Sequence, residues 1–310
     1  MDVRRRLSAV VLLLFVPFLV GRALGGYIDE SFTGTTAPDW TFVTGQGNGP
    51  SLTGGDEDPD GNGWLRLTDD VTNQASFVYY NNSIPTDKVL VAEFDFVTWS
   101  TTSSVADGFV LAIFDADATP DAGAYGGSLG YAQRTNEDGL AGGIAGFGFD
   151  EFGNFSNDTE GREGGPGQVQ NAVVLRGSQG DNRQDGYEYQ TGTDSLTDFS
   201  TTSATSRDDA TIHRARITIP TDKRVSVEWK PEDGSWTTLI DQYQCTLTCP
   251  ASVKIGFTAG TGSVTAYHEI RNLSVRAHVP EPGTALLGAL GGLLMVLVPN
   301  ARRLADRVFE

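Results

Sequence analysis

Short runs in which apolar and polar residues alternate recur along most of this 310-residue chain. Residues 64–68, 89–99 and 224–229 alternate clearly, which predicts strands with one buried and one exposed face. Clusters of Gly, Asp, Asn and Pro separate the runs, and no long helical pattern competes. Further runs of this kind are 77–80, 109–114, 172–175, 215–219, 252–257 and 269–275. We therefore expect an all-β fold, a sandwich or jelly roll of two packed antiparallel sheets.

The first 25 residues depart from this pattern. Three arginines at positions 4–6 precede an apolar stretch over 9–20, and Ala23-Leu24-Gly25 then offers small residues at which a signal peptidase could cut. Residues 1–25 are therefore predicted to be a signal peptide, and we expect an exported protein whose mature chain begins near Gly26 or Tyr27.

The last residues, 279–310, form a second exception. Val279-Pro280-Glu281-Pro282 comes before an apolar run over 284–298, and a basic cluster at Arg302, Arg303 and Arg307 follows. The prolines prevent helix continuation into a run that is apolar on every face, which predicts a membrane helix with everything before Pro280 outside the cytoplasm. The run is shorter than the ~20 residues that span a bilayer comfortably, so a buried core helix is the alternative.

This order of proline tetrapeptide, apolar helix and arginines resembles the PEP-CTERM sorting signal. The resemblance implies that an exosortase-type enzyme handles residues 279–310 and removes the helix. It also implies transient anchoring in the inner membrane of a Gram-negative-type bacterium, followed by delivery to the cell envelope, the cell surface or the extracellular matrix.

Between the two ends, residues 27–277 read as one large β domain, because no linker or internal repeat divides them. The formal net charge of the whole chain is −18. Such acidity argues against nucleic acid as a partner, because nucleic-acid affinity depends on Lys and Arg. It suits an exported protein or one that binds cations, although a solvated acidic face also explains most of the charge.

Two cysteines lie close together, Cys245 and Cys249. Exported proteins meet oxidising conditions, so we expect a structural disulfide that closes this short loop. A structural zinc site is the alternative, but it needs four ligands and neither a His nor a third Cys lies nearby.

Three stretches resemble L-type lectins of the legume-lectin fold, in order and in spacing. Residues 106–114 begin Ala-Asp-Gly before an apolar strand, 126–131 read Gly-Gly-Ser-Leu-Gly-Tyr, and 253–262 read Val-Lys-Ile-Gly-Phe-Thr-Ala-Gly-Thr-Gly before His-Glu-Ile at 268–270. The resemblance covers nearly the whole of 27–277. It implies a concanavalin-like jelly roll and a non-catalytic protein that binds carbohydrate, such as an extracellular polysaccharide.

A fourth stretch, 148–158, occupies the place of the lectin metal loop. An Asp, a backbone carbonyl, an Asn and a second Asp at close spacing can wrap one Ca²⁺. Matched to the lectin pattern, these ligands are the Asp150 carboxylate, the Phe152 carbonyl, the Asn154 side chain and the Asp158 carboxylate. The second, transition-metal site of these lectins is not expected, because Gly148 stands where its Glu belongs and no His precedes position 211. An Asx-rich connection without metal is the alternative.

The same resemblance assigns sugar binding to Asp107, to the Gly127 amide and to Asn154. A carboxylate accepts from sugar hydroxyls, the two amides donate, and an aromatic ring, Phe152 or Tyr125, covers an apolar face. Read separately, Asp107-Gly108 could be a plain turn and Gly126-Gly127 a bulge.

Sequence motifs for catalysis or for a second calcium site are weaker. Jelly-roll glucanases place Glu-x-Asp-x-x-Glu on one strand, and Glu93-Phe94-Asp95 begins that pattern, but Thr98 stands where the acid/base should be. His213, His268 and His278 are isolated in the sequence. The acidic run 56–63 reads as a turn before a strand, with a weak calcium site as a minority interpretation. We expect no enzyme, and a structural surface or matrix protein remains the main alternative to a lectin.

Overall fold

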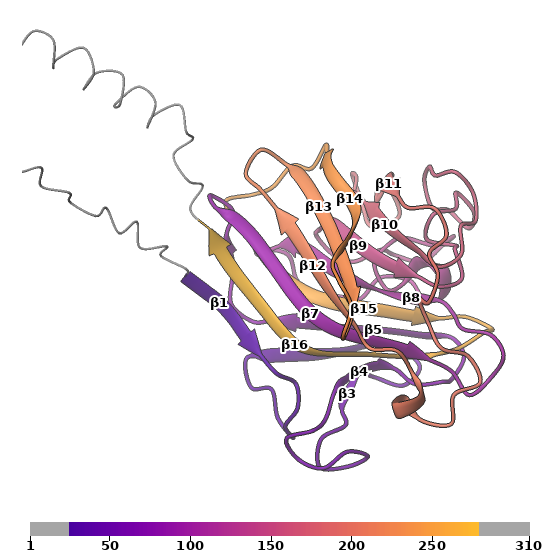
Figure 1. Cartoon of the computed structure of the whole chain (residues 1–310). Coiled ribbons are helices and arrows are strands. Elements are labelled where there is room, and N and C mark those ends of the chain that lie inside the picture. The colour runs from indigo at the N-terminus through magenta and orange to yellow at the C-terminus, as the bar shows by residue number, and fades with distance from the viewer. Residues whose placement is uncertain (1–24, 279–310) are drawn as a thin grey trace, which may run out of the picture.

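A computed structural model describes residues 25–278 as two antiparallel sheets packed face to face (Figure 1). This confirms the predicted all-β sandwich. The only helical elements in this range are two short 3₁₀ turns, η1 (Gly126–Ser128) and η2 (Arg207–Asp209). Each sheet has eight strands, and neighbouring strands within each sheet pair in antiparallel fashion.

The strands of each sheet follow a spatial order that differs from their order along the chain. The first sheet runs through β14 (Thr237–Gln244), β13 (Arg224–Pro231), β12 (His213–Ile219), β7 (Val89–Trp99), β16 (Tyr267–His278), β4 (Leu65–Thr68) and β3 (Ser51–Leu52), with β1 (Gly25–Glu30) pairing with β16. The second runs through β11 (Tyr189–Gly192), β10 (Ala172–Arg176), β9 (Gly143–Asp150), β8 (Gly108–Asp115), β15 (Ser252–Thr261), β5 (Gln74–Tyr80) and β2 (Trp40–Gln46), with β6 (Ile84–Pro85) pairing with β15.

Strand β7 shows how alternation builds the core. Phe94 and Phe96 are fully buried between the sheets, whereas Glu93 and Asp95 point to the outer face. Phe94 meets Phe257 of the opposite sheet edge-on, with ring centroids 5.0 Å apart. Burying each such ring stabilises the fold by roughly 2–3 kcal/mol, so the period-two pattern fixes which face of the strand is inside.

Strand β9 was missed by the sequence analysis because three glycines make it resemble a turn region. Two of these glycines make room for aromatic rings that pack on the outer side of the second sheet. A Cβ on Gly146 would lie 2.6 Å from the Tyr131 ring, and one on Gly148 would lie 2.4 Å from the Phe155 ring. The second sheet is therefore buried on both faces, by the first sheet and by the loops that carry Tyr131 and Phe155.

Both ends of the described chain lie side by side, because Gly25 pairs with Ala277 (Figure 1). No helix within residues 25–278 is long and apolar enough to cross a bilayer. The predicted signal peptide, apart from its last residue, and the predicted sorting signal at 279–310 lie outside the described residues, so these two assignments stay predictions.

The structure differs from the expected disulfide, because Cys245 and Cys249 are both free thiols. Cys245 is packed into the core between the sheets, and its Sγ lies 3.7 Å from the Tyr243 carbonyl. Burial raises the pKa of the Cys245 thiol to about 11, which keeps it in the unreactive protonated form. Cys249 is partly buried and packs against the same core cluster.

Candidate functional site

A pocket of about 220 Å³ opens where β8 begins, and the structure brings all three predicted sugar-binding residues to it. Asp107 precedes β8, Gly127 belongs to η1, and Asn154 lies in the loop after β9. Strand pairing explains the convergence, because Gly108 is the partner of Asp150 across β8 and β9. The loops that follow or precede these neighbouring strands therefore meet at one edge of the second sheet.

The Asp107 backbone is held from two sides. Its N–H donates to the Gly260 carbonyl at 3.2 Å, and its own carbonyl accepts from the Glu151 N–H at 3.0 Å. The residue is only 4% exposed, and its Oδ2 has no hydrogen-bond partner among the described residues. An unpaired buried acceptor costs about 1–3 kcal/mol, so this oxygen is available to a ligand that brings a hydroxyl or N–H.

The charges around Asp107 shift its titration. Burial raises the pKa of its carboxyl to about 7, the charges of His268 and Arg162 act against this shift, and that of Glu151 adds to it. His268 is not isolated in the fold: the Thr68 hydroxyl lies 2.9 Å from the Ala266 carbonyl and shares a hydrogen bond of 2.6 Å with Nδ1 of His268. This arrangement turns Nε2 of His268 toward Glu151 Oε2, at 3.1 Å.

Gly127 has to be a glycine because Asn154 lies directly against it. A Cβ at this position would be 2.2 Å from the Asn154 Cβ. The turn around it is tight, with Gly126 at φ +66° and Leu129 at φ 55°. The backbone of η1 and the Asn154 side chain therefore form one continuous wall of the pocket.

Both aromatic candidates for stacking on a sugar, Tyr125 and Phe152, line the pocket. The Arg134 guanidinium lies over the Tyr125 ring at 4.2 Å and pairs with Glu160 at 3.0 Å. One face of Tyr125 is therefore already covered. Phe152 is half-buried and has no aromatic or cationic neighbour on its ring among the described residues, which leaves it as the ring available for stacking.

No family model matches this chain, and no curated protein sequence matches it. Solved structures do. The Lotus tetragonolobus seed lectin is 16% identical with a TM-score of 0.57, over 82% of this chain and 100% of that one. The Bauhinia forficata lectin in complex with GalNAc is 19% identical with a TM-score of 0.55, over 83% and 99%. The exoplasmic/lumenal domain of VIP36, in a Ca²⁺/Man3GlcNAc-bound form, is 16% identical with a TM-score of 0.52, over 79% and 90%.

The chain has the jelly-roll fold of the legume lectins. The pocket around Asp107 therefore belongs to a lectin-type sandwich, with η1 and the loop after β9 at the same edge. At these identities the similarity establishes the fold alone.

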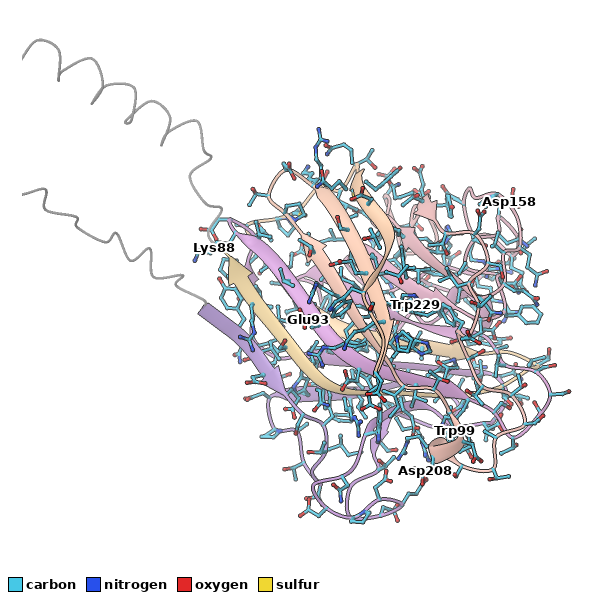
Figure 2. The ribbon with its side chains drawn as sticks, in the orientation of Figure 1. Lys88, Glu93, Trp99, Asp158, Asp208 and Trp229 are labelled. Atoms are coloured by element: carbon cyan, nitrogen blue, oxygen red, sulfur yellow. The ribbon has the colours of Figure 1, made fainter. Side chains whose placement is uncertain are left out.

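Two of the four residues predicted to hold calcium use their oxygens in hydrogen bonds within the protein. Asp150 is fully buried, and its two oxygens accept the N–H groups of Gly153 at 2.7 Å and Phe155 at 2.8 Å. The Phe152 carbonyl accepts from the Gln168 side chain at 2.9 Å. Asp158 is exposed in the loop between β9 and β10, at the edge of the molecule (Figure 2). Residues 25–278 contain no group of three or more His, Cys, Asp or Glu side chains that could hold a metal.

The residues considered for glycoside hydrolysis lie elsewhere. Glu93 pairs with Arg216 at 2.7 Å on the outer face of the first sheet (Figure 2). Burial alone would raise the pKa of Glu93, but hydrogen bonds from Arg216 and Arg214 outweigh it and hold the pKa below its usual value.

The acidic run 56–63 forms the predicted turn, in which Asp58 pairs with Arg207 at 2.8 Å.

Sequence reasoning missed three features of the site: the Glu151–His268 contact and two buried arginines, Arg162 and Arg176. Glu151 and His268 lie in two of the stretches that resemble lectins, but nothing in those stretches showed that the two side chains meet, and neither arginine belongs to a motif. A larger hollow of about 590 Å³ lies near Gly142–Gly143 and the 246–250 segment, and none of the residues of these three features lines it.

Proposed function

We propose that this chain is a non-catalytic carbohydrate-binding protein whose ligand binds in the pocket around Asp107. The observation that carries the proposal is the buried, unpartnered Oδ2 of Asp107, which shares one pocket with Gly127 and Asn154. The fold similarity to lectins, one of them in complex with GalNAc, supports the same conclusion.

Each part of the pocket has a role that suits a sugar. The Asp107 carboxylate accepts hydrogen bonds from hydroxyls, the Gly127 N–H and the Asn154 amide donate, and the Phe152 ring covers an apolar face. The pocket, about 220 Å³, is smaller than the roughly 300–1,000 Å³ that enclose drug-sized ligands. It therefore suits a single sugar unit, for example one at the end of a polysaccharide chain.

The predicted terminal signals support a proposal for where the protein acts. We propose export, handling by an exosortase-type enzyme with transient anchoring in the inner membrane, and delivery to a bacterial cell surface or extracellular matrix. A polysaccharide of that surface is then the proposed partner. The calcium expected from the sequence takes no part in the proposed contacts, because the Asp150 and Phe152 oxygens are hydrogen-bonded within the protein.

A glycan array with the full chain tests the proposal. The wild type should bind a defined set of glycans, Asp107→Ala should abolish binding, and Phe152→Ala should weaken it by about tenfold, the worth of one aromatic contact. The matched control is Glu93→Gln, on the opposite side of the sandwich, which should bind as the wild type does. Wild-type protein that binds no glycan would favour a structural surface protein, and binding that survives Asp107→Ala would place the site elsewhere.

A further inference from the structure

Arg176 is the last residue of β10, and its side chain is fully buried beneath the loop that follows β9. Its Nε donates to the Phe155 carbonyl at 2.7 Å, and Nη1 donates to the carbonyls of Glu163 and Tyr187, each at 2.8 Å. Nη2 donates to the Asn157 carbonyl at 3.3 Å and to the Gly164 carbonyl at 3.5 Å. The five N–H groups of one guanidinium are thus matched by five backbone carbonyls.

A positive charge surrounded by loop carbonyls is the arrangement that an oxygen-coordinated cation creates. No described carboxylate lies within ion-pair distance of Arg176, so its compensation comes from the carbonyl dipoles. Burial and the charge of Arg162 lower the pKa of Arg176, to about 9, while the charge of Asp150 acts in the opposite direction. Arg176 therefore stays charged at neutral pH, inside the loop that the sequence had assigned to a metal.

A second buried arginine connects that loop to the other wall of the pocket. Arg162 is 2% exposed, and its Nη1 donates to the Ser128 hydroxyl at 2.9 Å. Its Nη2 donates to Thr159 Oγ1 and Glu160 Oε2, both at 3.1 Å. Ser128 follows Gly127 directly, so Arg162 ties the loop that carries Asn154 to the turn that carries Gly127.

We propose that Arg176 and Arg162 take the place of bound calcium in this lectin fold and hold the 150–165 loop in its binding shape without a metal ion. The carboxylate that would meet the ion, Asp150, is instead used to order its own loop through the Gly153 and Phe155 N–H groups. This support of the loop is independent of which ligand the pocket takes.

Calcium measurements on the full chain test this directly. After dialysis against EDTA and then against buffer, the wild type should contain no stoichiometric calcium by elemental analysis. Its melting temperature should be the same in EDTA and in millimolar CaCl₂, because a ligand stabilises a fold only if it binds the native state. One calcium per chain, or a rise in melting temperature with CaCl₂, would overturn the proposal.

The variant Arg176→Lys tests the guanidinium itself. Lys keeps the charge but offers three donors in place of five, so we expect the melting temperature to fall by about 5–10 °C, with no recovery in CaCl₂. Arg183→Lys is the matched control, since Arg183 also donates to two backbone carbonyls but at the partly exposed surface. A loss at Arg176 no larger than that at Arg183 would contradict the proposal. If Arg176→Lys fails to fold, the calcium measurement on the wild type still tests the proposal. Neither measurement requires sugar binding, so the proposal can fail or hold independently of the proposed function.

Discussion

Two buried carboxyl groups in this sandwich have opposite surroundings. Glu269 on β16 is fully buried and accepts hydrogen bonds from Arg66, Arg207 and the Trp99 indole. Burial alone would raise the pKa of Glu269, but these partners outweigh it and hold the pKa below its usual value. Asp107 is nearly as buried, yet its pKa is raised to about 7 and one of its oxygens has no partner among the described residues.

The difference shows that partners, more than burial, decide what a buried carboxyl does. At Glu269 two guanidinium groups compensate the charge, and the result is a structural brace between β16 and the segments that carry Arg66 and Arg207. At Asp107 burial disfavours the charge, and Oδ2 has no hydrogen-bond partner among the described residues. This arrangement costs stability but leaves an acceptor for a ligand.

The largest effect is expected when the brace is broken. Glu269→Gln removes the fully buried carboxylate that Arg66 and Arg207 share and leaves these two buried guanidinium groups only with partly exposed partners such as Glu57 and Asp58, so the free energy of unfolding should fall by about 3–5 kcal/mol. Urea denaturation followed by tryptophan fluorescence measures this. Glu228→Gln, which removes a partly exposed partner of Arg216, is the control and should change the value by less than about 1 kcal/mol. Equal losses in the two variants would remove the contrast between buried and surface pairs.

The second effect is a pH dependence of stability with Asp107 as its source. Because the pKa of Asp107 is about 7 in the folded protein and 3.8 is its ordinary value, the folded state holds the proton more tightly. The contribution of this group to stability should therefore fall as pH rises from about 4 to 7, by up to about 4 kcal/mol, and stay constant above that. Urea unfolding at pH 5 and pH 8 compares the wild type with Asp107→Asn, which cannot titrate.

The expected result is that Asp107→Asn is more stable than the wild type at pH 8, with the advantage shrinking toward pH 4. Glycan binding should show the opposite trend, since the ionised Asp107 is the better acceptor and forms as pH rises through 7. A wild type and variant that differ by the same amount at both pH values would mean that Asp107 has no raised pKa.

The sequence predicted the architecture well because alternation reports directly on which face of a strand is buried. The nine predicted runs all fall within or overlap observed strands. Strand β9 was not predicted, because its glycines break the alternating pattern. Gly146 and Gly148 are required by contact with the rings of Tyr131 and Phe155, and a contact between residues that are distant in sequence leaves no local pattern. Edge strands β2 and β14 also escaped, since one-sided partial burial weakens their alternation.

The site was predictable in part. The residues 107, 127 and 154 meet in one pocket because strand order brings their loops together, and the family resemblance supplied that order. The four calcium positions could not be evaluated from the sequence, because whether Asp150 faces an ion or its own backbone is decided by loop geometry. Arg162 and Arg176 gave no signal, since a single arginine is buried only when the surrounding chain supplies carbonyls or hydroxyls for it.

The smallest effect is expected at Glu93, the residue that would be essential in a glycosidase. Its side chain is one quarter exposed and shares its arginines with Asp95 and Glu228, so Arg214 and Arg216 keep other partners after Glu93→Gln. The free energy of unfolding should therefore fall by less than about 1 kcal/mol, and glycan binding should be unchanged. Reducing-sugar release from β-glucans should be absent both from the wild type and from this variant. Release by the wild type that disappears in Glu93→Gln would move the function from the Asp107 pocket to the outer face of the first sheet, because Glu93 would then be acting on substrate despite its two arginines.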